Sequence, residues 1–180
     1  MHANQLRAGG QTPYIAHPMA VCALVLEAGG DEDQAIAALL HDTAEDHGGR
    51  KRLEDIRQRF GERVAAIVEG CTDTLDEPRP PWRVRKERYL DHLRQASDDV
   101  LLVAMADKLH NARSVLIDYQ QHGEAIWSRF AGGRDYATWY LVELARLFGR
   151  KRPSVLADEL SRVVREIVEL VGSTGASGGL

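Results

Sequence analysis

Apolar residues recur at intervals of three and four along almost the whole 180-residue chain, and the strict alternation typical of a half-buried strand is almost absent. A period near 3.6 residues is that of an α-helix with one buried face. Glycine and proline divide the pattern into segments of helical length. The sequence therefore predicts an all-α protein, a single compact bundle of about seven to nine helices.

The boundaries of the expected helices follow from turn and capping residues. The first helix begins at Pro18, because proline is tolerated in a first turn, and stops at Gly29. Asp31 and Gln34 form a capping-box pattern for a second helix, which we expect to continue through Asp46. Further helices are expected at 53–60, 62–71, 82–96, 98–119, 124–130, 136–148 and 154–171, with the clearest loop at 76–81. We expect one domain over residues 1–171, followed by a flexible tail at residues 172–180.

Composition narrows the class of protein. A formal net charge of −4 gives no overall attraction to nucleic acid. Two stretches, 50–63 and 79–94, lean basic; since both also contain acids, a solvated helix face is favoured over a basic rim that attracts a polyphosphate. No apolar run approaches the roughly 20 residues that cross a bilayer, and no signal peptide is apparent. Cys22 and Cys71 are interpreted as small buried hydrophobes, which suits a reducing cytoplasm. We therefore expect a cytoplasmic protein that contacts neither membrane nor nucleic acid.

A histidine and three acids follow the apolar run 37–40. His41 and Asp42 are adjacent, and Glu45 and Asp46 come shortly after them. On one continuous helix, at about 100° per residue, the four side chains would share one side. Carboxylates this close repel one another unless a cation holds them together. A histidine nitrogen beside a carboxylate oxygen suits Mn²⁺, Fe²⁺ or Zn²⁺. The alternative is simply an acidic helix end.

A second polar position interrupts the apolar segment 100–111. Asp107, Asn111 and Ser114 recur at helical spacing, opposite the apolar stripe of the same segment. An acid with apolar flanks needs a partner. A salt bridge from Lys108 or Arg113 would provide one, but we favour a metal.

Three motifs occur in a fixed order: Pro-Tyr-Ile-x-His-Pro at 13–18, His-Asp-Thr-x-Glu-Asp at 41–46 and Ala-Asp-Lys-Leu-His-Asn at 106–111. In the first motif, His17 stands at a helix start and is a fourth candidate ligand. Together the motifs resemble the hydrolase domain of RelA/SpoT-type enzymes and its stand-alone small-alarmone-hydrolase relatives, within the HD superfamily of metal-dependent phosphohydrolases. The resemblance runs from about residue 2 to about residue 119.

The resemblance implies a reaction and a set of roles. The reaction removes the 3′-pyrophosphate from guanosine tetra- or pentaphosphate (ppGpp or pppGpp) and leaves GDP or GTP. Residues 2–7 would form the last turns of the family's first helix, and 180 residues leave no room for the synthetase domain of the long enzymes, so synthesis is not expected. The implied roles are Mn²⁺ ligation by His17, His41, Asp42 and Asp107, water activation by Glu45 and Asp46, and substrate contact by Arg7, Tyr14, Asn111, Arg113 and Ser114.

Two other functions stay open beside the alarmone hydrolase. One is a phosphatase for another nucleotide, such as a nucleoside monophosphate or a phosphorylated dinucleotide like NADPH, because fold and metal centre do not fix the substrate. The other is a non-catalytic nucleotide sensor, against which the intact Glu45–Asp46 pair argues. The oligomeric state is not predicted, since Trp127, Trp139 and Tyr140 could anchor an interface as easily as a core.

Overall fold

The computed structural model describes residues 5–7, 11–46, 48–76 and 78–176, apart from the side chains of Asp46 and of residues 173–176. In these residues the regular structure is helical, with one isolated antiparallel bridge between Leu6 and Pro13. The all-α prediction is confirmed. Contacts group the chain into two compact units, Met1–Asp107 and Lys108–Leu180. The prediction of one domain over residues 1–171 stays a prediction.

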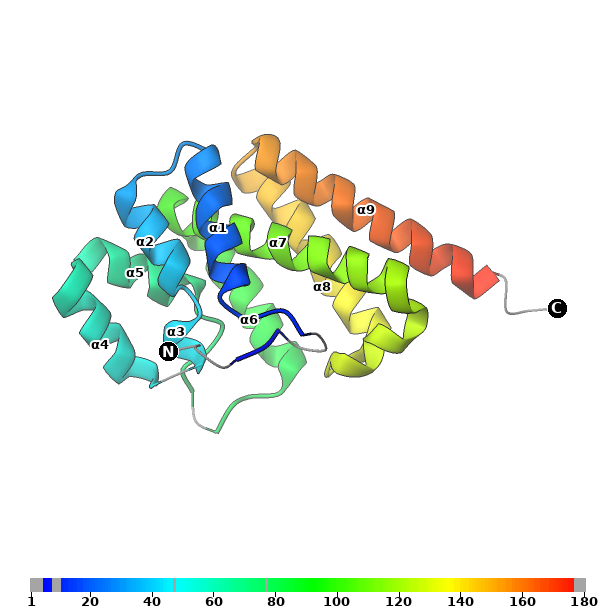
Figure 1. The fold of residues 1–180 in the computed structure, drawn as a ribbon, viewed down its shortest axis with the longest axis horizontal. Coiled ribbons are helices and arrows are strands. Elements are labelled where there is room, and N and C mark those ends of the chain that lie inside the picture. The colour runs from blue at the N-terminus through cyan, green and yellow to red at the C-terminus, as the bar shows by residue number, and fades with distance from the viewer. Residues whose placement is uncertain (1–4, 8–10, 47, 77, 177–180) are drawn as a thin grey trace. The chain divides into compact units, whose positions relative to one another are not determined.

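The first unit contains the helices and the turn that carry the four candidate ligand residues. Here α1 packs against α2, α2 and α4 pack against α5, and α3 packs against α4. The capping box at the start of α2 is confirmed: Asp31 accepts a hydrogen bond from the Gln34 N–H at 3.0 Å, and Gln34 accepts one from the Asp31 N–H at 2.9 Å. The elements are α1 (Ala16–Glu27), α2 (Glu32–Leu40), α3 (Thr43–Asp46), α4 (Gly49–Phe60), α5 (Glu62–Cys71), α6 (Trp82–Gln95) and the first part of α7 (Asp98–His122) (Figure 1).

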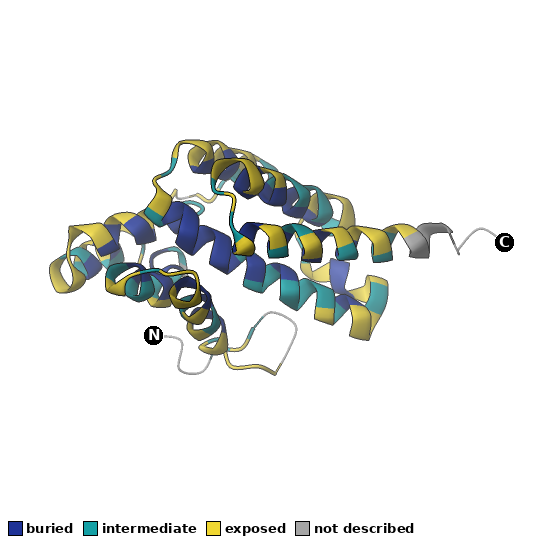
Figure 2. Cartoon of the chain, turned by 90° about the horizontal axis from the view of Figure 1, so that it is seen from above, coloured by how far each residue is buried: buried dark blue, intermediate teal, exposed yellow. Residues whose placement is uncertain are grey.

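The first part of α7 runs through the core of this unit. Every residue from 100 to 107 is buried (Figure 2). Gly70 of α5 lies so close to this segment that a Cβ atom there would come within 2.5 Å of a Val100 methyl group. A glycine at this position therefore lets α5 and α7 approach closely, and a helix buried on all sides carries Asp107 into the interior.

The predicted second helix is in fact two helices. α2 ends at Leu40, His41 and Asp42 form a turn, and α3 begins at Thr43. The Thr43 hydroxyl donates to the Leu40 carbonyl at 2.6 Å, and His41 Nδ1 lies 2.8 Å from the Ala38 carbonyl oxygen. Side-chain hydrogen bonds to these carbonyls compete with a continued helix. The prediction of one helix through Asp46 was wrong, and the shared side of its acids stays a prediction.

The segment before α1 also differs from expectation. Residues 5–7 are not helical, because the Arg7 N–H donates to the Thr12 carbonyl at 2.9 Å and the Tyr14 N–H donates to the Gln5 carbonyl at 2.8 Å. The expected last turns of a helix at residues 2–7 are therefore wrong for residues 5–7. Residues 2–4 lie outside the described part of the chain.

The second unit holds the rest of α7, the 3₁₀ helix η1 (Gly123–Arg129), α8 (Gly133–Lys151) and α9 (Val155–Ala176). α8 packs against both α9 and η1. Trp127 and Tyr140 are buried and belong to this packing, whereas Trp139 is half-buried. α9 continues to Ala176, five residues beyond its predicted end at 171. Residues 177–180 of the expected tail lie outside the described part.

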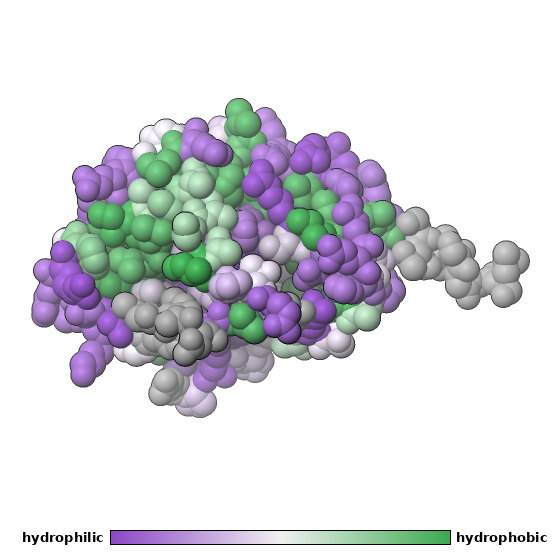
Figure 3. All heavy atoms as spheres, in the orientation of Figure 1, coloured by the Kyte–Doolittle hydropathy of each residue, from purple (hydrophilic) through white to green (hydrophobic). Residues whose placement is uncertain are grey.

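Some surface and burial features of the described residues can be compared with what the composition predicts. None of the described helices is both long and apolar enough to cross a membrane. Cys71 is buried as predicted, whereas Cys22 is half-buried, and both are free thiols. Apolar side chains gather on one face over α1 and α2 (Figure 3), where the exposed ones include Ile15, Met19 and Leu39.

Candidate metal centre

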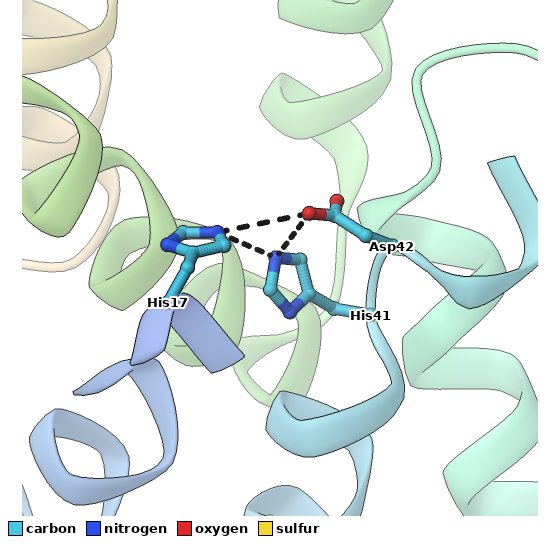
Figure 4. Close-up of side chains that lie close together, drawn as sticks. All are labelled: His17, His41 and Asp42. Carbon is cyan, nitrogen blue, oxygen red and sulfur yellow. Dashed lines mark hydrogen bonds and ion pairs between the residues drawn. The ribbon is translucent and has the colours of Figure 1, made fainter. Parts of the chain in front are cut away.

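The four predicted ligand residues lie together in the first unit. His17 comes from the start of α1, His41 and Asp42 from the turn between α2 and α3 (Figure 4), and Asp107 from α7. The two histidine Nε2 atoms are 3.2 Å apart. Asp42 Oδ2 lies 3.2 Å from His41 Nε2 and 3.7 Å from His17 Nε2. Asp107 Oδ1 lies 3.1 Å from His17 Nε2 and 3.6 Å from His41 Nε2.

These separations fit a single bound cation. Ligand atoms about 2.1 Å from one ion stand about 3.0 Å apart at right angles and about 3.4 Å apart in a tetrahedron. The measured nitrogen–oxygen separations run from 3.1 to 3.7 Å. The ligand atoms of His17, His41 and Asp42 all lie within 4.8 Å of one another. Two imidazole nitrogens with two carboxylate oxygens suit a divalent transition metal.

The site is buried except on the side of Asp42. His17, His41 and Asp107 are each at most 3% exposed, whereas the Asp42 side chain is 31% exposed. The contact between His41 Nδ1 and the Ala38 carbonyl fixes the ring, because a carbonyl only accepts and Nδ1 must carry the proton. Nε2 is thereby directed into the cluster. Solvent can reach the cluster past Asp42.

Electrostatics in the metal-free cluster favour a protonated histidine. Burial lowers the pKa of His41, but the carboxylates of Asp42 and Asp107 outweigh it and raise the pKa to about 10. Burial raises the pKa of Asp42, but His41 and a hydrogen bond from Tyr14 lower it to about 2. At neutral pH His41 is therefore an imidazolium beside carboxylates. A metal ion that binds His41 Nε2 must therefore displace a proton from this nitrogen.

We expect the metal-free protein to lose stability as the pH rises from 6.5 towards 10. A histidine whose pKa rises from 6.5 unfolded to about 10 folded contributes stability that is complete below pH 6.5 and lost as the pH passes the folded value. Thermal unfolding of chelator-treated protein across this range measures the loss. The His41→Ala variant should show a flatter pH dependence. Equal slopes for the two proteins would mean that the buried charge pair does not form.

Tyr14 and Glu45 lie beside the ligands but have partners that the sequence did not indicate. The Tyr14 hydroxyl donates to Asp42 Oδ2. Glu45 Oε2 accepts from the backbone N–H of Asp73 at 3.1 Å, and Glu45 Oε1 pairs with the guanidinium of Arg79. The basic stretch 79–94 was interpreted as a solvated helix face, but Arg79 precedes α6. The sequence of residues 79–94 alone does not identify Glu45 as the partner of Arg79.

The other predicted site residues are placed as follows. Asp46 ends α3, and its side chain lies outside the described part. Arg7 is half-buried in the segment before α1. Asn111, Arg113 and Ser114 belong to the second unit, where Arg113 pairs with Glu159 at 2.6 Å and the Ser114 hydroxyl donates to the His110 carbonyl at 3.0 Å.

The family follows from comparison with known proteins. The model of the HD domain family matches residues 1–135 of this chain. The chain belongs to the HD domain family. An HD domain implies a bound divalent metal, and the His/Asp cluster is a possible place for it.

Relatives of this HD domain bear the names of alarmone enzymes. The guanosine-3′,5′-bis(diphosphate) 3′-pyrophosphohydrolase MESH1 of Xenopus tropicalis is 39% identical over 117 residues, which are 63% of this chain and 63% of that protein. The enzyme of that activity from Aquifex aeolicus is 37% identical over 116 residues, 64% of this chain and 16% of that protein. The GTP pyrophosphokinase of Streptomyces coelicolor is 38% identical over 176 residues, 92% of this chain and 20% of that protein. This HD domain therefore spans between 16% and 63% of these three relatives.

Two solved structures share the fold of this HD domain. A metazoan ortholog of SpoT, described as hydrolysing ppGpp, matches with a TM-score of 0.73 and 27% identity over 92% of this chain and 88% of that chain. A crystal structure of a Listeria monocytogenes protein matches with a TM-score of 0.73 and 28% identity over 85% of this chain and 99% of that chain. The prediction of an HD-type helical bundle is confirmed.

Proposed function

We propose that this protein is a metal-dependent 3′-pyrophosphohydrolase of guanosine tetra- and pentaphosphate. The observation that carries the proposal is the cluster of His17, His41, Asp42 and Asp107, with ligand separations that suit one ion. The names of the relatives support the alarmone as the substrate. Mn²⁺ is the ion we propose, because imidazole suits transition metals and carboxylate suits harder cations such as manganese.

The proposed chemistry divides between the ion and the side chains. A divalent cation bound by the four ligands would polarise a phosphoryl oxygen and favour deprotonation of the attacking water. The water oxygen forms a bond to the phosphorus attached to the 3′-oxygen, and the bond between that phosphorus and the 3′-oxygen breaks. Glu45 and Asp46 are proposed to orient the water and accept its proton. The Asp73 N–H holds the Glu45 carboxylate for this role.

Substrate contacts are proposed for residues beyond the ligands. The Tyr14 hydroxyl donates to Asp42 on the exposed side of the cluster, and we propose that Tyr14 contacts the substrate there. The remaining proposed contacts are Arg7, Asn111, Arg113 and Ser114, whose donors suit phosphate and sugar oxygens.

The identity of the released group tests this proposal. Turnover of guanosine tetraphosphate should give GDP and pyrophosphate in equal amounts, because the bond to the 3′-oxygen is the one that breaks. Phosphorus NMR of the reaction mixture with Mn²⁺ separates pyrophosphate from orthophosphate. A panel containing nucleoside monophosphates and NADPH serves as the comparison. Orthophosphate as the product, released from many members of the panel, would contradict the proposal and indicate a general nucleotide phosphatase.

A further inference from the structure

The loop between α5 and α6, residues 72–81, is anchored at two points by the start of α6. Asp73 Oδ2 pairs with Arg85 and lies 3.1 Å from Lys86 Nζ. Arg85 Nε also donates to the Pro80 carbonyl at 3.2 Å. The Asp73 and Arg85 side chains are only 7% and 11% exposed, so water screens their attraction weakly. These contacts fix both the beginning and the end of the loop.

Arg79 stands near the end of this loop, between Pro78 and Pro80. Each proline has a fixed φ angle, and a residue before proline is restricted to extended conformations. The backbone of Arg79 therefore has few conformations to choose from. From this position its guanidinium reaches α3 and pairs with Glu45, which is 34 residues away in the sequence.

Five charged side chains make up this region, which we call the loop cluster: Glu45, Asp73, Arg79, Arg85 and Lys86. Among these five described side chains, three cations face two carboxylates. Burial and the nearby charge of Arg85 lower the pKa of Arg79. Its side chain is 51% exposed, whereas those of Arg85 and Lys86 are 11% and 16% exposed. Arg79 is the cation of the cluster that an anion from solvent can reach.

We propose that Arg79 binds phosphate oxygens of the nucleotide substrate, with Glu45 holding its guanidinium in place. A guanidinium has five N–H donors, and the pair with Glu45 engages Nη2. One arginine can therefore hold a carboxylate and still donate to a phosphate. Glu45 lies in α3, three residues after the candidate ligand Asp42, which stands in the turn just before that helix. A phosphate chain that starts at the metal ligands can thus extend to Arg79.

This inference rests on the proposed function, and kinetics of the Arg79→Ala variant test it. Loss of a charge-assisted hydrogen bond should raise the KM for guanosine tetraphosphate about 10- to 100-fold, while kcat changes much less. Arg94→Ala is the matched control: Arg94 is 53% exposed, lies in the same basic stretch and pairs with Asp91 within α6. Its KM should stay near that of the natural protein. Arg79→Lys keeps the charge without the planar fork and should give an intermediate KM.

A second measurement needs no turnover. Calorimetry with inorganic pyrophosphate and the metal-loaded protein should show weaker binding to Arg79→Ala than to Arg94→Ala. If the natural protein does not hydrolyse guanosine tetraphosphate, the proposed function fails, but this comparison still decides the role of Arg79. Equal pyrophosphate affinity in the two variants, or no pyrophosphate binding by the natural protein, would overturn the inference. Equal KM values in the two variants would also overturn it.

Discussion

Replacing Glu45 by Gln together with Asp46 by Asn should lower kcat by about 10²- to 10⁴-fold, the usual loss when a general base is removed. The amides keep the shape of the carboxylates but cannot accept the proton of the attacking water. Metal content should stay close to that of the natural protein, since Glu45 is not among the clustered ligand atoms of the described residues and the proposed ligands are all retained. Stability should change little, because the pair lost with Glu45 involves an Arg79 side chain that is 51% exposed.

The chain offers a matched control for this double substitution. Glu54 and Asp55 form another adjacent Glu–Asp pair, on α4, where their side chains are 53% and 41% exposed. Glu54→Gln with Asp55→Asn removes the same charges outside the ligand cluster and should leave kcat nearly unchanged. If the Glu45/Asp46 variant keeps more than about a tenth of the natural kcat, these residues do not act as the base.

His41→Ala and Asp107→Ala should each abolish metal retention and, with it, measurable turnover. Each change removes one of four candidate ligands from a buried site and breaks a buried charge pair, which typically costs about 3–5 kcal/mol of stability. Elemental analysis of protein purified without added metal should find about one equivalent in the natural protein and far less in the variants. His122→Ala, an exposed histidine at the end of α7, is the control and should keep its metal.

A further variant keeps this prediction testable where the alanine variants do not fold. Asp42→Asn alters the exposed edge of the cluster and preserves side-chain shape, so it should fold while binding metal more weakly. Circular dichroism separates loss of fold from loss of metal. Full metal retention in folded His41→Ala and Asp107→Ala protein would show that the ion, if present, is bound elsewhere.

The helices and the four candidate ligand residues that lie together could be predicted because their signals are local. Glycine and proline mark helix ends, and the capping residues Asp31 and Gln34, three positions apart, mark the start of α2. Asp107 could be singled out because a carboxylate inside an apolar helix needs a partner, and two histidines lie beside it.

The remaining features depend on contacts that a one-dimensional pattern does not contain. The break at His41 follows from hydrogen bonds of the His41 and Thr43 side chains to carbonyls of α2, although the segment has the periodicity of one helix. The pair between Arg79 and Glu45 joins residues 34 positions apart across a loop. No helical spacing predicts such a pair.

The deep burial of His17, His41 and Asp107 links metal supply to the amount of folded protein. These groups form the cluster only in the folded chain, so the metal binds the native state far better than the unfolded state. Each tenfold excess of free metal over its dissociation constant then adds about 1.4 kcal/mol to the free energy of unfolding. The free energy of unfolding of a folded domain is only about 5–15 kcal/mol in total. A cell short of the metal would therefore degrade this protein faster, and its abundance would fall.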